Sequence, residues 1–346
     1  MERITGSETM LNIASSMSGT TSAEGTEDMT LSMITGNDPA FSTHINQLTD
    51  WIKSSKTPDI IHLSSTLLIG IAKVLRQQLN IPIVCSVQDE EVWIDSLNSF
   101  HSDKAWQGIA ENIGYIESFI TTSEFYKNIA HKKIPGIKSI EVIYPGVDRK
   151  KYASTGYPEF PTIGFFYRMN KENGLNILAE AFVRLKKQNI IPHLKLKIGG
   201  GYTGKDKAFL KKIKKTLEPY REDIEICEDY NLENHAGFYN SVSVISVPLT
   251  FEEGVGLYLC EAFAAGRPAV EPATGSFPEI VGEAGILYEP NSSEALANTL
   301  LKLLNNTELY TRTAEKAREL SESRYNEKVL AEKLISTYKK IVVSGK

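Results

Sequence analysis

The sequence predicts an α/β protein of two domains, whose doubly wound parallel β-sheets carry helices on both faces. Short apolar runs of strand length alternate with longer segments of helical spacing along most of the chain. Parallel strands need a crossover connection, so this alternation favours parallel sheets over antiparallel ones. A chain of 346 residues is also long enough for two domains of ordinary size.

The first half of the chain alternates regularly between the two patterns. Ligands of parallel sheets bind beyond the carboxyl ends of the strands, so residues that directly follow a strand are candidate site residues. We expect strands at 29–35, 59–63, 83–87 and 118–122, and helices at 41–54, 66–79 and 106–115.

A polar segment with Gly and Pro, 148–161, separates the halves and is typical of a linker. The second half alternates in the same way. We expect strands at 162–166, 194–198, 223–226 and 242–247, and helices at 175–187, 205–215, 257–264, 293–304, 308–323 and 327–342.

Composition and charge exclude several classes of protein. The hydrophobic fraction of 41% and the charged fraction of 23% are those of a globular protein, and a net charge of −5 argues against a nucleic-acid binder. We find no signal peptide and no apolar run near 18 residues, so we expect a cytoplasmic protein with at most peripheral membrane contact. We expect reduced core thiols and no structural metal site, because the cysteines lie in apolar patterns without CxxC spacing: Cys85, Cys227 and Cys260.

The most informative stretch follows the apolar run 242–247. Two acids, Glu252 and Glu253, lead into Gly254-Val255-Gly256, and a helix then runs from Leu257 until Gly266 ends it. A helix N-terminus after a strand presents free backbone N–H groups and a partial positive charge to an anion. The glycines let a ligand approach without meeting a Cβ. The sequence therefore predicts an anion site here.

Two carboxylates accompany this predicted helix N-terminus. Glu253 lies in the loop and Glu261 lies about one turn into the helix, so both can face one pocket. One acid would then lie near the hydroxyls of a sugar, and the other would accept hydrogen bonds from a ribose diol. The alternative is an ordinary βα loop with two solvated acids, and chemistry alone does not separate the two interpretations.

The spacing of this stretch carries a family resemblance. The pattern from 253 to 281 resembles the donor-site signature of the retaining GT-B glycosyltransferases of family 4, and it keeps one register throughout. Its parts are Glu253-Gly254-Val255-Gly256-Leu257 with Glu261-Ala262, then Gly266-Arg267-Pro268-Ala269-Val270, then Gly275-Ser276-Phe277-Pro278-Glu279-Ile280-Val281.

The resemblance implies a GT-B fold, in which two Rossmann-like domains face a cleft. It places the acceptor-side domain at 1–153, the nucleotide-sugar-binding domain at 154–323, and a last helix that crosses back to the first domain at 324–346. It also implies transfer of a hexosyl unit, with retention, from a UDP- or GDP-linked sugar. The acceptor would be a hydroxyl of a sugar, a lipid-linked sugar or a small molecule, as in polysaccharide biosynthesis, and neither a metal nor another cofactor would be needed.

The resemblance also assigns residues around the donor diphosphate. Arg168 matches a family arginine that clamps the diphosphate, whereas Asn173 stands where the family has a second cation, a lysine. Lys171, two residues earlier, is the candidate to replace that charge. Tyr230 falls where the family holds the nucleotide base.

On the acceptor side the sequence departs from the family pattern. The Gly-rich loop that contacts acceptor and donor phosphates corresponds to Gly6, but no strand fits before it, so the first strand is either missing or degenerate. Gln88 replaces a family histidine near the transferred sugar, and an amide cannot exchange protons near neutral pH. Asp89 is either the carboxylate of this site or the N-cap of the next helix.

These departures keep two further interpretations open. One is a non-catalytic GT-B subunit that binds a nucleotide sugar or a partner transferase, as the changes at Gln88 and Asn173 suggest. The other is a sugar-nucleotide epimerase of the same fold. The pair Glu253 and Glu261 with Arg168 fits a transferase better than either. The oligomeric state does not follow from the sequence.

Overall fold

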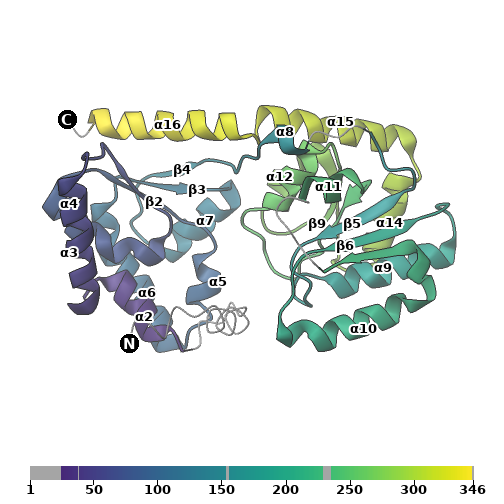
Figure 1. Ribbon diagram of the computed structural model, residues 1–346, viewed down its shortest axis with the longest axis horizontal. Coiled ribbons are helices and arrows are strands. Elements are labelled where there is room, and N and C mark those ends of the chain that lie inside the picture. The colour runs from purple at the N-terminus through teal and green to yellow at the C-terminus, as the bar shows by residue number, and fades with distance from the viewer. Residues whose placement is uncertain (1–24, 38, 153–155, 229–234, 345–346) are drawn as a thin grey trace. The chain divides into compact units, whose positions relative to one another are not determined.

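The computed structural model describes residues 25–37, 39–152, 156–228 and 235–344. Within these ranges the chain forms two compact units. The N-terminal unit comprises the described residues up to Tyr144 together with those from Ala331 onward, and the C-terminal unit comprises those from Pro145 to Leu330. Both units have the predicted α/β architecture, with one parallel sheet each (Figure 1).

The N-terminal unit contains a four-stranded parallel sheet in the order β1-β2-β3-β4. Its central strands are buried on both faces, and in β2 the side chains of Ile83, Val84 and Cys85 have no exposed surface. Such apolar strands are the expected sequence of a covered parallel sheet. The bounds are β1 (Ile61–Leu63), β2 (Ile83–Ser86), β3 (Ser118–Thr121) and β4 (Ile140–Val142).

Helices η1, α6 and α7 of this unit begin at side-chain caps. Ser65, Asn98 and Ser123 each accept a backbone N–H of the first turn of the helix that follows. The bounds are α2 (Glu27–Thr35), α3 (Pro39–Ser54), η1 (Thr66–Ile71), α4 (Ala72–Leu79), α5 (Glu90–Ile94), α6 (Ser99–Asn112), η2 (Ile113–Tyr115) and α7 (Glu124–Lys133).

The strand predicted at 29–35 is wrong, because these residues form helix α2. The alternation of Met and Leu with Thr and Ser imitated a strand, but the helix signals are stronger. Acids at Glu27 and Asp28 complement the positive end of the helix, and Gly36 ends it in the left-handed conformation at φ 68°. Thr30 and Ile34, four residues apart, then share the buried face.

The C-terminal unit contains a six-stranded parallel sheet in the order β10-β9-β8-β5-β6-β7. The order reverses between β5 and β8, which are neighbours although two strands separate them in sequence. This is the topological switch point of a doubly wound sheet, where ligands bind beyond the strand ends. The bounds are β5 (Thr162–Phe166), β6 (Lys195–Gly199), β7 (Ile224–Cys227), β8 (Val244–Ile245), β9 (Ala269–Pro272) and β10 (Gly285–Tyr288).

Helices cover this sheet in two groups. Helix α9 packs against α10 and α14, whereas α12 packs against α8, α11 and α15 (Figure 1). The bounds are α8 (Arg149–Tyr152), α9 (Leu175–Gln188), η3 (Gly204–Asp206), α10 (Lys207–Leu217), η4 (Glu218–Asp223), α11 (His235–Asn240), α12 (Leu257–Ala264), α13 (Phe277–Val281), η6 (Gly282–Ala284), α14 (Ser293–Leu304) and α15 (Thr307–Ser323).

The last helix, α16 (Glu327–Ser344), contributes its first turn to the C-terminal unit and the remainder to the N-terminal unit. Tyr338 anchors that remainder, because its hydroxyl lies 2.6 Å from Nδ1 of His62, whose Nε2 lies 2.9 Å from the hydroxyl of Ser86. Burial lowers the pKa of His62. None of the helices in the described ranges has the length and apolar character needed to span a bilayer.

The three cysteines are free thiols, as expected. Cys85 and Cys260 are buried, whereas Cys227, at the end of β7, is only half-buried. Burial raises the pKa of the Cys85 thiol and, more weakly, that of Cys227. Both thiols therefore stay protonated near neutral pH and poorly reactive.

Candidate functional site

The loops that follow β5, β6, β8 and β9 meet at the carboxyl edge of the C-terminal sheet. A Cβ added to Gly174 would lie 1.9 Å from the carbonyl oxygen of Pro248, and one added to Gly200 would lie 2.0 Å from that of Tyr167. The backbone N–H of Thr250 donates to the carbonyl of Glu172 at 2.9 Å. These contacts bring loop 167–174 against both the Gly-rich loop after β6 and the loop after β8, at the switch point of the sheet.

Glu253 folds back onto the start of helix α12. Its Oε1 accepts the backbone N–H groups of Val255 at 2.9 Å and Gly256 at 3.2 Å, and its Oε2 accepts the hydroxyl of Tyr167 at 3.1 Å. The residue is only 6% exposed. Gly256 occupies the N-cap position at φ 63°, which a residue with a Cβ rarely adopts. The backbone N–H groups at the start of helix α12 thus already donate to a carboxylate of the chain itself, as expected of free N–H groups at a helix N-terminus.

The rest of the loop conforms to the expected shape. Gly254 is buried, and the side chain of Leu257 is exposed. Gly275, at φ 58°, packs against the loop, since a Cβ there would lie 2.6 Å from the backbone nitrogen of Glu253. The N–H of Ser276 donates to the carbonyl of Glu253 at 2.8 Å. The first and third parts of the sequence pattern therefore form one packed structure.

Glu261 is buried in a polar cluster that the sequence did not reveal. Its Oε1 accepts the hydroxyl of Tyr152 at 2.7 Å and lies 3.3 Å from Nδ1 of His235, and its Oε2 accepts the hydroxyl of Tyr239 at 2.8 Å. The residue is 8% exposed. It is therefore not a solvated surface acid, the alternative that the sequence left open for Glu253 and Glu261.

Arg168 is engaged with the loop after β6. Its Nη2 lies 3.2 Å from both Thr203 Oγ1 and Asp206 Oδ2. Burial alone would raise the pKa of Asp206, but hydrogen bonds from Thr203 and Arg168 hold it below its ordinary value. The carboxylate of Asp206 therefore stays charged and anchors the guanidinium.

Asn173 braces the same loop from inside. It is 5% exposed, and its Nδ2 donates to the carbonyl oxygen of Arg168 at 2.8 Å. Its backbone N–H donates to Asn170 Oδ1 at 2.9 Å. Lys171 lies exposed at the tip of the loop. The place of the expected second cation thus holds a structural amide, and Lys171 is the nearest lysine along the chain.

A third buried carboxyl lies behind the site on strand β9. Glu271 is fully buried, and both its oxygens lie 3.1 Å from the backbone nitrogen of Val247. Burial raises the pKa of Glu271 well above its ordinary value, and the nearby Glu253 adds to the shift. Strand β8 is shorter than the predicted 242–247. By accepting the Val247 N–H, Glu271 provides a hydrogen-bond partner for the backbone just after this strand. An acid within an apolar run was its signal in the sequence.

Gln88 and Asp89 follow β2 in the N-terminal unit. Gln88 is exposed. Asp89 does occupy the N-cap position of α5, but its side chain makes no capping hydrogen bond and its φ is 57°. The left-handed conformation at a non-glycine residue is a strain found at functional sites.

Glu90, which the sequence did not single out, stabilises this turn. It is 3% exposed, and its carboxylate accepts the backbone N–H groups of Thr66 and Gln88 and the hydroxyl of Ser65. Burial raises the pKa of Glu90. The run Asp89-Glu90-Glu91 gave no way to decide which of its acids turns inward. Two other predicted site residues, Gly6 and Tyr230, lie outside the described residues.

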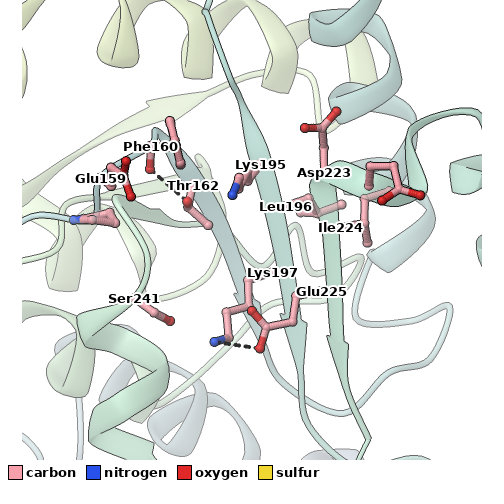
Figure 2. Close-up of a pocket in the computed structure, with 12 residues that line it drawn as sticks. Glu159, Phe160, Thr162, Lys195, Leu196, Lys197, Asp223, Ile224, Glu225 and Ser241 are labelled. Carbon is pink, nitrogen blue, oxygen red and sulfur yellow. Dashed lines mark hydrogen bonds and ion pairs between the residues drawn. The ribbon is translucent and has the colours of Figure 1, made fainter.

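The C-terminal unit also has a hollow of about 360 Å³, at the amino edge of its sheet. Figure 2 shows its lining, which includes Thr162 and Lys195 at the amino ends of β5 and β6. Lys197 and Glu225 form an ion pair across it at 3.0 Å. The hollow therefore lies away from the converging loops and is not part of the candidate site.

The fold and the site together have the arrangement in which doubly wound sheets commonly bind anionic ligands: a Gly-lined helix N-terminus at the switch point of the sheet. Residues 160–306 match the family model described as glycosyl transferases group 1. This region of the chain is therefore similar to the group 1 glycosyltransferases.

Curated relatives agree with this similarity. The D-inositol 3-phosphate glycosyltransferase of Corynebacterium glutamicum is 25% identical over 225 residues, which cover 57% of this chain and 51% of the relative. The N-acetyl-alpha-D-glucosaminyl L-malate synthase of Bacillus anthracis is 34% identical over 103 residues, which cover 29% of this chain and 26% of the relative. The chain thus spans about half or less of the length of these two relatives.

Solved structures show the GT-B fold. The sucrose-phosphate synthase of Thermosynechococcus elongatus aligns with a TM-score of 0.70 at 19% identity, covering 88% of this chain and 78% of that protein. Anabaena HepE, in complex with UDP and glucose, aligns with a TM-score of 0.69 at 15% identity, covering 92% and 97%. The predicted fold class is confirmed, and the match over residues 160–306 agrees with the predicted family.

Proposed function

We propose that the protein is a retaining, metal-independent glycosyltransferase that moves a hexosyl unit from a nucleoside diphosphate sugar to an acceptor hydroxyl. The observation that carries the proposal is the pairing of an anion-binding helix N-terminus with two buried carboxylates, Glu253 and Glu261. The match to the family model and the likeness to a structure that holds UDP and glucose support it. The donor is then linked to UDP or GDP, and the acceptor is a sugar, a lipid-linked sugar or a small molecule.

In this proposal the backbone N–H groups around Val255–Leu257 receive the diphosphate. Glu253 now accepts the N–H groups of Val255 and Gly256, so the donor takes over this position and leaves the carboxylate to the sugar hydroxyls. Glu261 accepts hydrogen bonds from the ribose. Arg168 stabilises the negative charge that develops on the leaving diphosphate.

The chemical step exchanges one bond of the anomeric carbon for another. The bond from this carbon to the phosphate oxygen breaks as a bond to the acceptor oxygen forms on the same face, and the leaving phosphate takes the acceptor proton. Asp89 would orient the acceptor, and Gln88 would donate a hydrogen bond to a sugar hydroxyl. Tyr230 would lie at the nucleotide base, and Gly6 at the phosphates. The reaction would take place in the cytoplasm, with at most peripheral membrane contact.

A donor panel tests the proposal directly. Each candidate nucleotide sugar is added in turn, and the melting temperature and the release of free nucleoside diphosphate are measured. A ligand that binds only the folded chain raises its apparent stability. We expect one donor to do both. If no donor did either, the proposal would be abandoned.

The first specific prediction concerns Glu261. We expect Glu261→Gln to weaken donor binding by about 1–3 kcal/mol, the scale of a hydrogen bond to a charged group. A glutamine offers one acceptor oxygen instead of two. Calorimetric titration measures the change, and Glu252→Gln, an exposed acid of the neighbouring loop, is the matched control. Equal affinities in the two variants would exclude the ribose role of Glu261.

The second prediction concerns metal ions. In this proposal the α12 N-terminus and Arg168 neutralise the diphosphate, so a bound cation is not required. We therefore expect activity to survive treatment with EDTA, measured as nucleoside diphosphate release before and after chelation. A strict requirement for added Mn²⁺ would show that the reaction belongs to another class of transferase.

A non-catalytic GT-B subunit is the second candidate. One observation favours it: Asn173 replaces the second cation with a loop brace. This candidate predicts a rise in melting temperature with a nucleotide sugar but no release of nucleoside diphosphate with any acceptor. The donor panel therefore separates the two functions.

A further inference from the structure

The carboxylate of Glu261 is nearly saturated with hydrogen-bond donors. A carboxylate offers about four acceptor positions. Tyr152, Tyr239 and the ring of His235 are within hydrogen-bond distance of its oxygens, at 2.7, 2.8 and 3.3 Å. A ribose diol that donates two hydrogen bonds needs two positions. One of the three present donors must therefore lose its hydrogen bond when a ribose binds. The two that remain determine the orientation of the carboxylate.

The two tyrosines form a clamp on this carboxylate. Tyr152 donates to Oε1 and Tyr239 donates to Oε2, so together they fix both the position and the plane of the group. Their rings pack edge to face with centroids 5.9 Å apart, and both rings are buried. His235 makes the longest of the three contacts. It is therefore the donor that yields to the ribose.

Burial raises the pKa of the Tyr152 hydroxyl, as does its hydrogen bond to Glu261. The hydroxyl therefore stays protonated and donates at every pH at which the protein would be assayed. Tyr152 belongs to α8, a four-residue helix more than one hundred residues before Glu261 in the chain. Tyr152 lies outside the family sequence pattern of residues 253–281, yet it contacts Glu261 within that pattern.

We propose that Tyr152 is a positioning residue for nucleotide recognition, which holds the Glu261 carboxylate in the orientation that accepts the ribose of a nucleoside diphosphate. This inference rests on the proposed function, because it assumes that Glu261 faces the ribose. Without the Tyr152 hydroxyl, one oxygen loses a short, charge-assisted hydrogen bond, and Tyr239 alone cannot fix the plane of the carboxylate.

The test compares two ligands that differ only in the ribose hydroxyls, UDP and 2′,3′-dideoxy-UDP, by calorimetric titration of the whole chain. If the chain binds GDP instead of UDP, the guanosine pair takes their place. We expect the wild-type chain to prefer UDP about tenfold or more. We expect Tyr152→Phe to weaken UDP binding about tenfold, the scale of one hydrogen bond to a charged group, and to leave dideoxy-UDP binding unchanged.

Tyr157→Phe is the matched control, because Tyr157 lies close to Tyr152 in the sequence. Its ring packs against Arg267 and Tyr310 rather than against Glu261. We expect this variant to keep the wild-type preference for UDP. Equal losses for both ligands in Tyr152→Phe would overturn the inference, since a merely structural role weakens both. An unchanged or tighter affinity for UDP in Tyr152→Phe would overturn it as well.

Measurements on the wild-type chain alone test the assumption that Glu261 faces the ribose. A wild-type chain that binds UDP and dideoxy-UDP equally would remove the ribose role of Glu261, and with it part of the proposed function. A chain that binds neither UDP nor GDP would remove the nucleotide site altogether. A preference for UDP in the wild type that persists in Tyr152→Phe would reject the role of Tyr152 and leave the proposed function in place.

Discussion

Arg168→Ala is expected to reduce transferase activity by about 10²–10³-fold, the loss seen when one preorganised electrostatic group is removed from an active site. The family's second cation is absent, because Asn173 occupies its place. Arg168 would then be the main side-chain cation beside the leaving diphosphate. The rate of nucleoside diphosphate release, measured at saturating donor, reports the loss.

The present partners of Arg168 sharpen this expectation. The guanidinium is held by Thr203 and Asp206 at 3.2 Å, so its position is fixed before the donor arrives. Such preorganisation means that no reorientation is needed in the transition state. Arg184→Ala, an exposed arginine on α9, is the matched control and should keep full activity. A similar, small loss of activity in both variants would exclude a role of Arg168 in binding the diphosphate and would favour the non-catalytic subunit.

Asn173 shows why sequence comparison alone is not enough here. Considered as a missing lysine, Asn173→Lys should restore a charge-assisted contact to phosphate. In the structure the amide is buried and donates to the carbonyl of Arg168. A lysine would lose this hydrogen bond and bury an ammonium group, so we no longer expect tighter diphosphate binding from that change.

The parts of the structure that the sequence predicted best are those with local signals. Helix α12 begins at Leu257, as expected, because Gly256 and the apolar spacing after it are adjacent in the chain. The predicted α14 matches its observed bounds, with Ser292 as its cap. In contrast, α2 was misjudged because its helix signals, two acids and Gly36, lie at the ends of a segment whose middle alternates like a strand.

The surroundings of the two site carboxylates could not be predicted, because their partners are distant in sequence. Tyr152 and Tyr167 reach Glu261 and Glu253 across 109 and 86 residues. No spacing rule connects a hydroxyl on one element with a carboxylate on another at that range. The sequence therefore indicated which acids matter, but not that each is held by tyrosine hydroxyls.

Arg267 offers the second large effect, on stability rather than activity. It lies inside the sequence pattern of the donor site, yet its side chain is completely buried. Its Nε donates to the carbonyl of Tyr239 at 3.0 Å, and its Nη2 donates to the carbonyls of Gly156 at 2.6 Å and Asn240 at 3.1 Å. The guanidinium thus joins the segment before β5 to the end of α11, the helix that carries Tyr239.

We expect Arg267→Ala to lower the free energy of unfolding of the chain by about 3–5 kcal/mol, because it leaves three backbone carbonyl oxygens without their donor and opens a void. Arg267→Lys keeps the charge but not the planar fork, so it should fall between alanine and the wild type. Urea denaturation measures both, with Arg312→Ala, an exposed arginine of α15, as the control. Arg267→Ala could also unfold at the same urea concentration as Arg312→Ala. The carbonyls of Tyr239, Gly156 and Asn240 would then have found other donors. Arg267 would in that case have to act on the ligand instead of stabilising the fold.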